Sequence, residues 1–208
     1  MDIYAPIGCG LQTGAGTVLN VLKPGKDDSV VVFGLGNVGL TALMAKKYLG
    51  TGQIIAVDID QEKLDMGKDV GATHTVNSRE QTDVVKAIKD ITKGGAAYAI
   101  DCTGLVAVIE NVVECLAPLG IAAIVRVRPA EKKVSLDPLS FLLENKRLIG
   151  VIIGDSNPQE FVPKLVELQR KGHFPTEKLC RKYPVERFKD AIHDLHLGNV
   201  IKPVIQWG

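Results

Sequence analysis

A glycine motif between a buried strand and a helix constrains this chain more than any other feature. Residues 29–33 are an apolar, β-branched run, typical of a strand buried on both faces of a parallel sheet. The motif Gly-Leu-Gly-Asn-Val-Gly follows at 34–39, and residues 37–49 have the pattern of a helix. In this context Gly34 permits a tight turn, Gly36 lets the backbone approach a pyrophosphate, and Gly39 allows close packing of helix on strand. The helix N-terminus offers N–H groups and a positive dipole end to phosphates, so the motif predicts a dinucleotide-binding unit.

An acidic residue follows the second strand at the spacing that such a unit requires. Residues 53–58 form the next apolar run, and Asp58 ends it, about 20 residues after the glycine motif. A carboxylate at this place binds the adenosine ribose hydroxyls and repels a ribose 2′-phosphate. Since no arginine lies beside Asp58 in the sequence, we expect NAD rather than NADP. A glycine-rich turn with an incidental aspartate is the alternative, and the agreement of context and spacing weighs against it.

Strand and helix patterns alternate up to about residue 156, which predicts a parallel sheet with helices on both faces. The expected fold class is α/β: a doubly wound, parallel, six-stranded sheet (a Rossmann fold) with a short C-terminal α+β appendage. The expected domains are an NAD-binding domain over 1–156, whose first 13 residues come from an interdomain hinge, and an appendage over 157–208. Strands are expected at 29–33, 53–58, 74–77, 96–101, 121–127, 148–153 and 201–206. Helices are expected at 14–23, 37–49, 60–70, 82–92, 106–116, 158–172 and 185–196, the last two without a strong strand between them.

Composition narrows the range of partners. The chain is 46% hydrophobic and 24% charged, and 25 basic against 24 acidic residues give a formal net charge of +1. A nucleic-acid or membrane-surface partner would usually need a basic excess. No apolar run reaches the roughly 18 residues of a membrane span, and no secretory signal is visible at the N-terminus. We therefore expect a cytoplasmic protein with neither a nucleic-acid nor a membrane partner.

The four cysteines are not spaced as a zinc knuckle or a redox pair. Cytosolic thiols are normally reduced, so free cysteines are expected. Cys102 and Cys115 lie in apolar segments and are expected in the core, whereas Cys180 lies between basic residues without an evident partner.

The stretch Gly-Cys-Gly-Leu-Gln-Thr-Gly-Ala-Gly at 8–16, continuing to the glycine motif, resembles the zinc-dependent medium-chain alcohol dehydrogenases. Two later stretches, Gly-Asp-Ser-Asn-Pro-Gln-Glu-Phe at 154–161 and Gly-Asn-Val-Ile-Lys-Pro at 198–203, narrow the resemblance to the aryl (benzyl) alcohol dehydrogenase branch. The resemblance covers essentially the whole chain. It implies an oxidoreductase that transfers hydride between an alcohol and NAD.

The resemblance also implies roles for single residues. Asp58 takes the adenosine ribose, Lys63 lies along the adenosine, Thr13 and Val38 lie near the nicotinamide, and Lys202 reaches the pyrophosphate from the tail. The full set of implied cofactor-binding residues is Thr13, Gly34, Gly36, Asn37, Val38, Gly39, Asp58, Lys63, Arg126 and Lys202.

Two departures from the family pattern bear on function. In this family the N-terminal domain supplies the alcohol pocket and two ligands of the catalytic zinc, a Cys and a His. This chain starts just upstream of Cys9, which matches the remaining zinc ligand. A catalytic zinc needs about three protein ligands, so zinc is expected in the parent family but not in this chain. His193 and His196 are expected on a solvated helix face.

The second departure is Arg126, where the family usually has glycine. Its side chain would fill the nicotinamide site, clash with the positively charged nicotinamide ring, or extend into the space of the missing domain.

Two functions stay open. The first is the NAD-binding domain of a zinc-type alcohol dehydrogenase, inactive as this chain alone. The second is a natural truncated protein repurposed as a dinucleotide- or small-molecule-binding module or a non-redox enzyme, which Arg126 and Arg128 favour slightly. An upstream reading frame for the missing domain would favour the first, and a true start codon at Met1 the second. In addition, the apolar run 148–153 at a sheet edge predicts a homodimer that joins two sheets.

Overall fold

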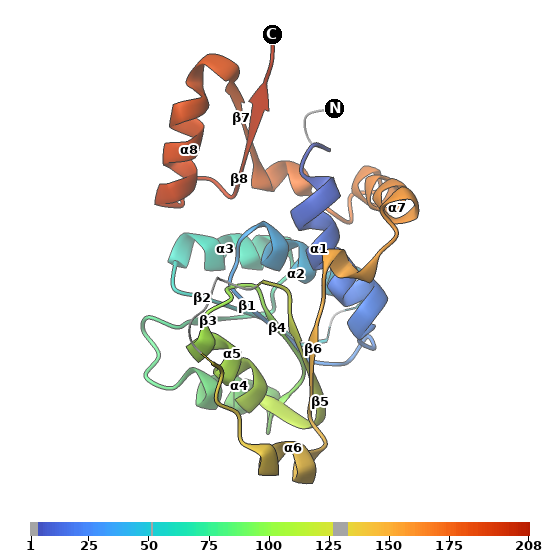
Figure 1. Cartoon of the computed structure of the whole chain (residues 1–208), viewed down its shortest axis with the longest axis vertical. Helices are drawn as coiled ribbons and strands as arrows, with labels where there is room; N and C mark the ends of the chain where they lie inside the picture. The colour runs from blue at the N-terminus through green and yellow to red at the C-terminus, as the bar shows by residue number, and fades with distance from the viewer. Residues whose placement is uncertain (1–3, 51, 127–132) are drawn as a thin grey trace.

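The computed structural model describes residues 4–50, 52–126 and 133–208, and its centre is a six-stranded parallel sheet (Figure 1). The strand order is β3-β2-β1-β4-β5-β6. The chain therefore starts in the middle of the sheet, builds one half outward to β3, and returns to build the other half, which confirms the doubly wound fold predicted from the alternating pattern. The strands of this sheet are β1 (Val30–Phe33), β2 (Ile54–Asp58), β3 (His74–Asn77), β4 (Ala96–Asp101), β5 (Leu116–Ile124) and β6 (Arg147–Gly150).

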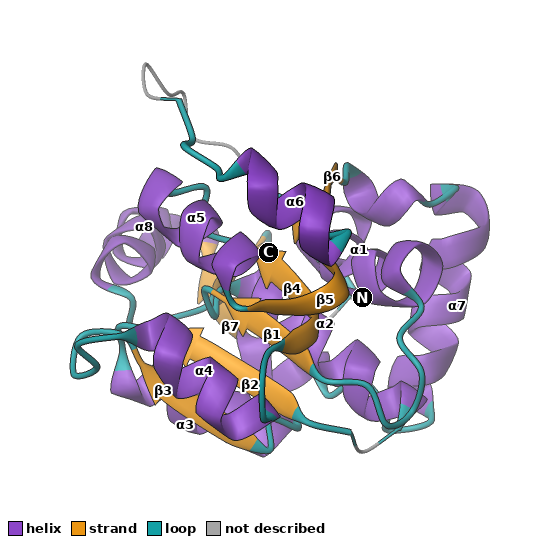
Figure 2. Ribbon diagram, turned by 90° about the horizontal axis from the view of Figure 1, so that it is seen from below, coloured by secondary structure: helices purple, strands orange, loops and turns teal. Residues whose placement is uncertain are grey.

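Helices cover both faces of the sheet (Figure 2). Side chains alternate between the faces of a strand, so β1 sends Val30 and Val32 into one hydrophobic cluster and Val31 and Phe33 into another. The first cluster includes residues of α1, α2, α3 and α7, and the second includes residues of α4 and α5. The helices are α1 (Gln12–Gly16), α2 (Asn37–Leu49), α3 (Gln61–Val70), α4 (Val84–Thr92), α5 (Val106–Glu114), α6 (Pro138–Glu144), α7 (Pro158–Arg170) and α8 (Phe188–Leu197).

Short polar side chains fix where several helices begin. Asp60 accepts a hydrogen bond from the Glu62 N–H at 3.0 Å to begin α3, and Asp83 accepts one from the Lys86 N–H at 2.8 Å to begin α4. These caps satisfy N–H groups that the helices themselves leave without partners, which is why the chain turns at these points.

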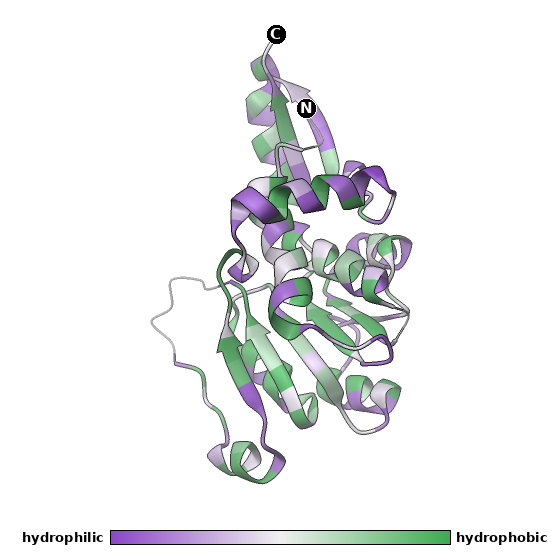
Figure 3. Cartoon of the chain, turned by 90° about the vertical axis from the view of Figure 1, so that its right-hand side faces the viewer, coloured by the Kyte–Doolittle hydropathy of each residue, from purple (hydrophilic) through white to green (hydrophobic). Residues whose placement is uncertain are grey.

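Only the outer part of the predicted 157–208 appendage stands apart from the sheet, at the top of Figure 1; it consists of α8 and a parallel pair of strands, whereas α7 packs on the first hydrophobic cluster. These strands are β7 (Cys180–Pro184) and β8 (Lys202–Gln206). In Figure 3 apolar and polar residues alternate around α8, as expected of a helix with one face to pack. Within the described residues, no helix is both long and apolar enough to cross a membrane.

The structure corrects several predicted boundaries. The first helical segment runs over residues 7–22, as η1 (Ile7–Leu11), α1 and η2 (Thr17–Leu22), rather than over 14–23. Its glycines weaken local helix propensity, and burial against α2 compensates. β5 begins at Leu116, inside a predicted helix, and α6 and β7 were not predicted; β7 separates the two last helices. Residue 127 of the predicted fifth strand and Arg128 lie outside the described residues.

The edge strand is also shorter than predicted. β6 is Arg147–Gly150 rather than 148–153, and it includes a charged residue. It does lie at the edge of the sheet. Beyond the strand, Gly154 adopts a left-handed conformation (φ 64°) and comes so close to Gly16 that a Cβ on either would clash with the other's backbone.

Candidate functional site

The carboxyl ends of four neighbouring strands open into one cavity of about 480 Å³. The glycine motif follows β1, Asp58 ends β2, Cys102 and Thr103 follow β4, and Arg126 follows β5. At β1 the chain changes its direction of travel across the sheet, and ligands of doubly wound folds bind in the crevice at such a point. The predicted cofactor-binding residues that line this cavity are Gly34, Gly36, Asn37, Val38, Gly39, Asp58, Lys63 and Arg126.

Two predicted residues are not among those that line the cavity. The Thr13 hydroxyl is nearly buried and donates a hydrogen bond to the Cys9 carbonyl oxygen at 2.9 Å. Lys202 begins β8 in the appendage, where its charge acts on Cys180. The proposed contacts of both residues with a coenzyme therefore stay predictions.

At each glycine of the motif, a side chain would interfere with the local structure or with ligand access in a different way. Gly34 has a φ of 89°, and a Cβ there would lie 2.7 Å from Thr103 Cγ2. A Cβ on Gly39 would clash with the carbonyl oxygen of Gly34. On Gly36 it would meet nothing within 4 Å, because this residue faces the open cavity. The backbone at Gly36 and the first N–H groups of α2 are thus accessible to a phosphate, as a pyrophosphate cradle requires.

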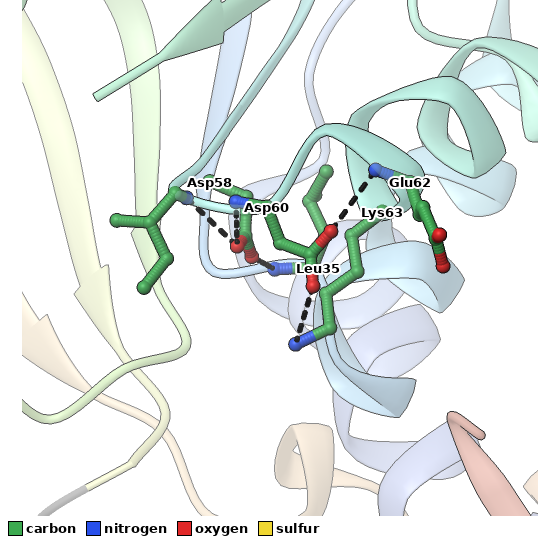
Figure 4. Close-up of polar contacts among 6 residues, drawn as sticks. Leu35, Asp58, Asp60, Glu62 and Lys63 are labelled. Atoms are coloured by element: carbon green, nitrogen blue, oxygen red, sulfur yellow. Dashed lines mark hydrogen bonds and ion pairs between the residues drawn. The ribbon is translucent and has the colours of Figure 1, made fainter. Parts of the chain in front are cut away.

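The Asp58 carboxylate is held in place by backbone N–H groups (Figure 4). One oxygen accepts a hydrogen bond from the Leu35 N–H at 2.6 Å, and the other accepts from Ile59 at 2.8 Å and Asp60 at 3.1 Å. The bond to Leu35 ties the end of β2 to the glycine motif after β1. Two carboxylate oxygens have about four lone-pair sites between them, and three are used here, so about one site remains for a ribose hydroxyl.

A second hollow, which was not predicted from the sequence, lies beside the Asp58 end of the cavity. It shares Ile59 and Lys63 with the main cavity and is also lined by Asp60 and Arg79. Lys63 Nζ lies 4.0 Å from Asp60 Oδ2. Arg79 follows β3 and is distant in sequence from Asp58, but the parallel pairing of β2 with β3 brings the two strand ends together. An arginine is therefore near Asp58 in space, although none is beside it in sequence.

A buried carboxylate shapes the far side of the cavity, and sequence reasoning missed it. Asp101, fully buried at the end of β4, accepts hydrogen bonds from the Thr103 N–H at 2.9 Å, the Thr103 hydroxyl at 2.7 Å and the Gly104 N–H at 3.0 Å. These bonds fix the loop that lines the cavity after β4. The sequence signal that could have identified Asp101 is its position at the end of an apolar strand, which matches the position of Asp58 at the end of β2. Beside it, burial raises the pKa of the Cys102 thiol, and Asp101 adds to the effect.

The first helical segment packs directly on the glycine motif through its own glycines. An added Cβ on Gly10 would clash with the Asn37 side chain, and one on Gly14 with the carbonyl oxygen of Val38. The glycines in 8–16 therefore allow this segment to approach the start of α2. The segment also carries Cys9, which is exposed.

The predicted zinc ligand Cys9 lacks a complete set of partner ligands among the described residues. Among the residues that the structure describes, no group of three or more His, Cys, Asp or Glu side chains is placed to hold a metal ion. Cys9 thus offers a single ligand, which does not fit a catalytic zinc by itself. His193 and His196 are exposed on α8, in agreement with the expected solvated face.

Comparison with known proteins finds alcohol dehydrogenases, in sequence and in structure. A family model described as zinc-binding dehydrogenase matches residues 37–170. The chain is 33% identical over 205 residues to geraniol dehydrogenase of Castellaniella defragrans, covering 99% of this chain and 55% of that protein. It is 34% identical to alcohol dehydrogenase 2 of Zea mays, covering 99% and 55%. Among solved structures, benzyl alcohol dehydrogenase of Acinetobacter calcoaceticus is 39% identical with a TM-score of 0.96, covering 100% of this chain and 57% of that one. The chain thus spans about half the length of the relatives it matches.

Proposed function

Because the chain belongs to the zinc-binding dehydrogenase family, we propose that it is the NAD-binding part of an alcohol dehydrogenase. One observation supports this above all: the glycine motif and a backbone-anchored Asp58 line the same cavity at the carboxyl edge of the sheet. The open space at Gly36 fits a pyrophosphate, and the remaining acceptor site of Asp58 fits a ribose hydroxyl.

The order of the strands supports a direction for the bound coenzyme. Adenosine lies at the end of β2 on Asp58, the pyrophosphate lies on residues 34–39 after β1, and the nicotinamide half extends over the ends of β4 and β5. When bound, NAD supplies the hydride acceptor, and the protein supplies its position. In this arrangement Asp101 acts indirectly, by fixing the loop under the nicotinamide half.

We propose that this chain alone binds NAD(H) without oxidising alcohols. Cys9 provides one zinc ligand where a catalytic site needs about three. The remaining ligands and the alcohol pocket would lie in the portion of the relatives that this chain does not match.

The appendage supports a division of the chain at about residue 156. Its helix α8 exposes Phe188, Ile192 and Leu195, which lie on one face at helical spacing, and Trp207 beyond β8 is 81% exposed. Large apolar side chains on one surface indicate an interface. We propose that the appendage, residues 157–208, contacts the catalytic portion through the exposed face of α8 and Trp207, with residues 1–13 as the hinge. The α7 part of this segment already packs on the first hydrophobic cluster through Phe161, Leu165 and Leu168.

Two further proposals concern assembly and location. A homodimer would form through the β6 edge, where Ile152, just beyond the strand, is 79% exposed. A cytoplasmic location agrees with four free cysteines.

The second candidate function is a small-molecule-binding module without redox activity. The observation that favours it is Arg126, which places a cation in the cavity at the end proposed for the nicotinamide. A ligand with an anionic group at that end would then replace the dinucleotide.

Calorimetric titration of the chain with NAD, NADH and ADP-ribose tests the proposed function. We expect saturable binding of all three at one site. Gly36→Val should abolish it without unfolding the protein, because a side chain there would enter the cradle and its Cβ would meet nothing within 4 Å. If the unaltered chain binds none of the three, the dinucleotide proposal is wrong.

A further inference from the structure

Arg126 lies at the end of the cavity farthest from Asp58. It follows β5, while Asp58 ends β2, and β1 and β4 lie between these strands. Neighbouring strands are about 4.8 Å apart, so the two residues are separated by roughly 14 Å across the sheet edge. A dinucleotide with its adenosine on Asp58 and its pyrophosphate on the glycine motif must direct its nicotinamide toward Arg126.

The guanidinium of Arg126 is not neutralised within the described part of the chain. No hydrogen bond or ion pair joins it to another described residue, and its side chain is exposed to the cavity. Its charge reaches into the site: it lowers the pKa of the buried Cys102 thiol, against the larger opposing effects of burial and of the Asp101 carboxylate. A free positive charge therefore faces the place where the redox state of the coenzyme is decided.

The two forms of the coenzyme differ in charge at that place. The nicotinamide ring of NAD⁺ carries a positive charge, and the ring of NADH is neutral. We propose that Arg126 makes this cavity bind NADH more tightly than NAD⁺, by repelling the oxidised ring. This inference rests on the proposed function, because it requires the dinucleotide to occupy the cavity.

Simple electrostatics gives the size of the effect. Two unit charges about 6 Å apart, at an effective dielectric constant between that of a protein surface and that of water, change an affinity by roughly 3- to 100-fold. Since Arg126 is exposed, we expect about tenfold, decreasing as salt is added.

The test compares Kd values for NAD⁺, NADH and ADP-ribose in the unaltered chain, in Arg126→Gln and in Arg126→Lys. We expect Arg126→Gln to tighten NAD⁺ about tenfold and to leave NADH and ADP-ribose nearly unchanged. Arg126→Lys keeps the charge and should keep most of the preference for NADH. Arg79→Gln is the matched control, because it removes an exposed arginine at the adenosine end and should leave the NAD⁺ to NADH ratio unaltered.

Three outcomes would overturn the inference. An unchanged NAD⁺ to NADH ratio in Arg126→Gln would show that the charge does not act on the ring. Equal weakening of all three ligands would show that Arg126 binds the pyrophosphate instead. If ADP-ribose and both coenzymes fail to bind the unaltered chain, the proposed function fails first and the inference on Arg126 fails with it.

Discussion

The Asp58 carboxylate is oriented before any ligand arrives, because three backbone N–H groups hold it. Its negative charge is what separates NAD from NADP in the proposal, since a ribose 2′-phosphate would lie against it. Arg79 lines the neighbouring hollow, and its positive charge would attract a ribose 2′-phosphate and so favour NADP. We expect the balance between these two residues to set the coenzyme preference.

We expect Asp58→Asn to weaken NAD binding by about 1.5–3 kcal/mol, the value of a hydrogen bond to a charged group. NADP binding should change less, so the preference for NAD should narrow. Calorimetry with both coenzymes measures this, and Asp69→Asn, an exposed residue of α3 outside the cavity, is the control. Equal affinity of the unaltered chain for NAD and NADP would contradict the prediction and point to Arg79.

The four thiols should react in the order of their exposure. Cys9 is exposed and should be alkylated first, while Cys102 and Cys115 are buried. Burial raises the pKa of the Cys115 thiol to about 12, so this thiol stays protonated, and unreactive, even at about pH 9. Mass mapping of labelled peptides checks the order, and rapid native labelling of Cys115 would show that the core opens.

The raised pKa of Cys115 has a consequence for stability. Above the ordinary value of 9.0 the unfolded thiol loses its proton while the folded thiol keeps it. The unfolded state then binds fewer protons, so the free energy of unfolding decreases as pH rises from about 9 toward 12.

Among the elements, the crossing of the first helical segment with α2 matters most for the site. Gly14 and Gly10 bring that segment against the backbone of Val38 and the side chain of Asn37. The position of the glycine motif thus depends on a helix that is distant from it in sequence. This contact also connects the cavity to Cys9, which is on the same segment.

We expect Gly14→Ala to lower the free energy of unfolding by about 1–3 kcal/mol, because the added methyl overpacks the crossing. It should also weaken NAD binding by displacing Val38. Gly8→Ala is the matched control, since a Cβ there meets nothing within 4 Å and alanine is the better helix former. Chemical denaturation measures both variants. Equal stability of the two would mean that the helices do not cross as closely as described.

For the whole molecule, the first question is whether two chains associate. Ile152 is exposed beside the β6 edge, and Leu142 of α6 is 77% exposed. We expect a dimer at micromolar concentration by sedimentation, and Ile152→Lys should convert it to a monomer. Leu197→Lys, on α8, should leave the dimer intact. A monomeric unaltered chain, or a dimer that survives Ile152→Lys, would exclude this interface.

The second question is whether the chain alone is active. We expect no zinc-dependent turnover of benzyl alcohol with NAD, measured by NADH absorbance with zinc added or chelated. Without a bound metal there is no Lewis acid to favour an alkoxide, and the matched relatives are about twice as long. Turnover, or stoichiometric zinc retained through dialysis, would refute this and direct attention to His193, His196 and the other cysteines.

The sequence by itself determined the features that depend on neighbouring residues. The apolar run before Gly34, the glycine spacing and the position of Asp58 were sufficient to predict a doubly wound sheet with a dinucleotide motif, and α2, β3 and β4 have the predicted bounds. Local patterns of this kind follow from backbone conformation and from the alternation of side chains along each element.

Only the tertiary structure decided the features that join distant segments. It placed Arg79 beside the adenosine end, Asp101 under the loop after β4, and Arg126 in the same cavity as the glycine motif. It also paired β8 with β7, and β7 is a strand that the local pattern did not reveal. The physical reason is that these contacts form between strand ends and helix faces that meet when the sheet assembles, and no local periodicity records which ends will be neighbours.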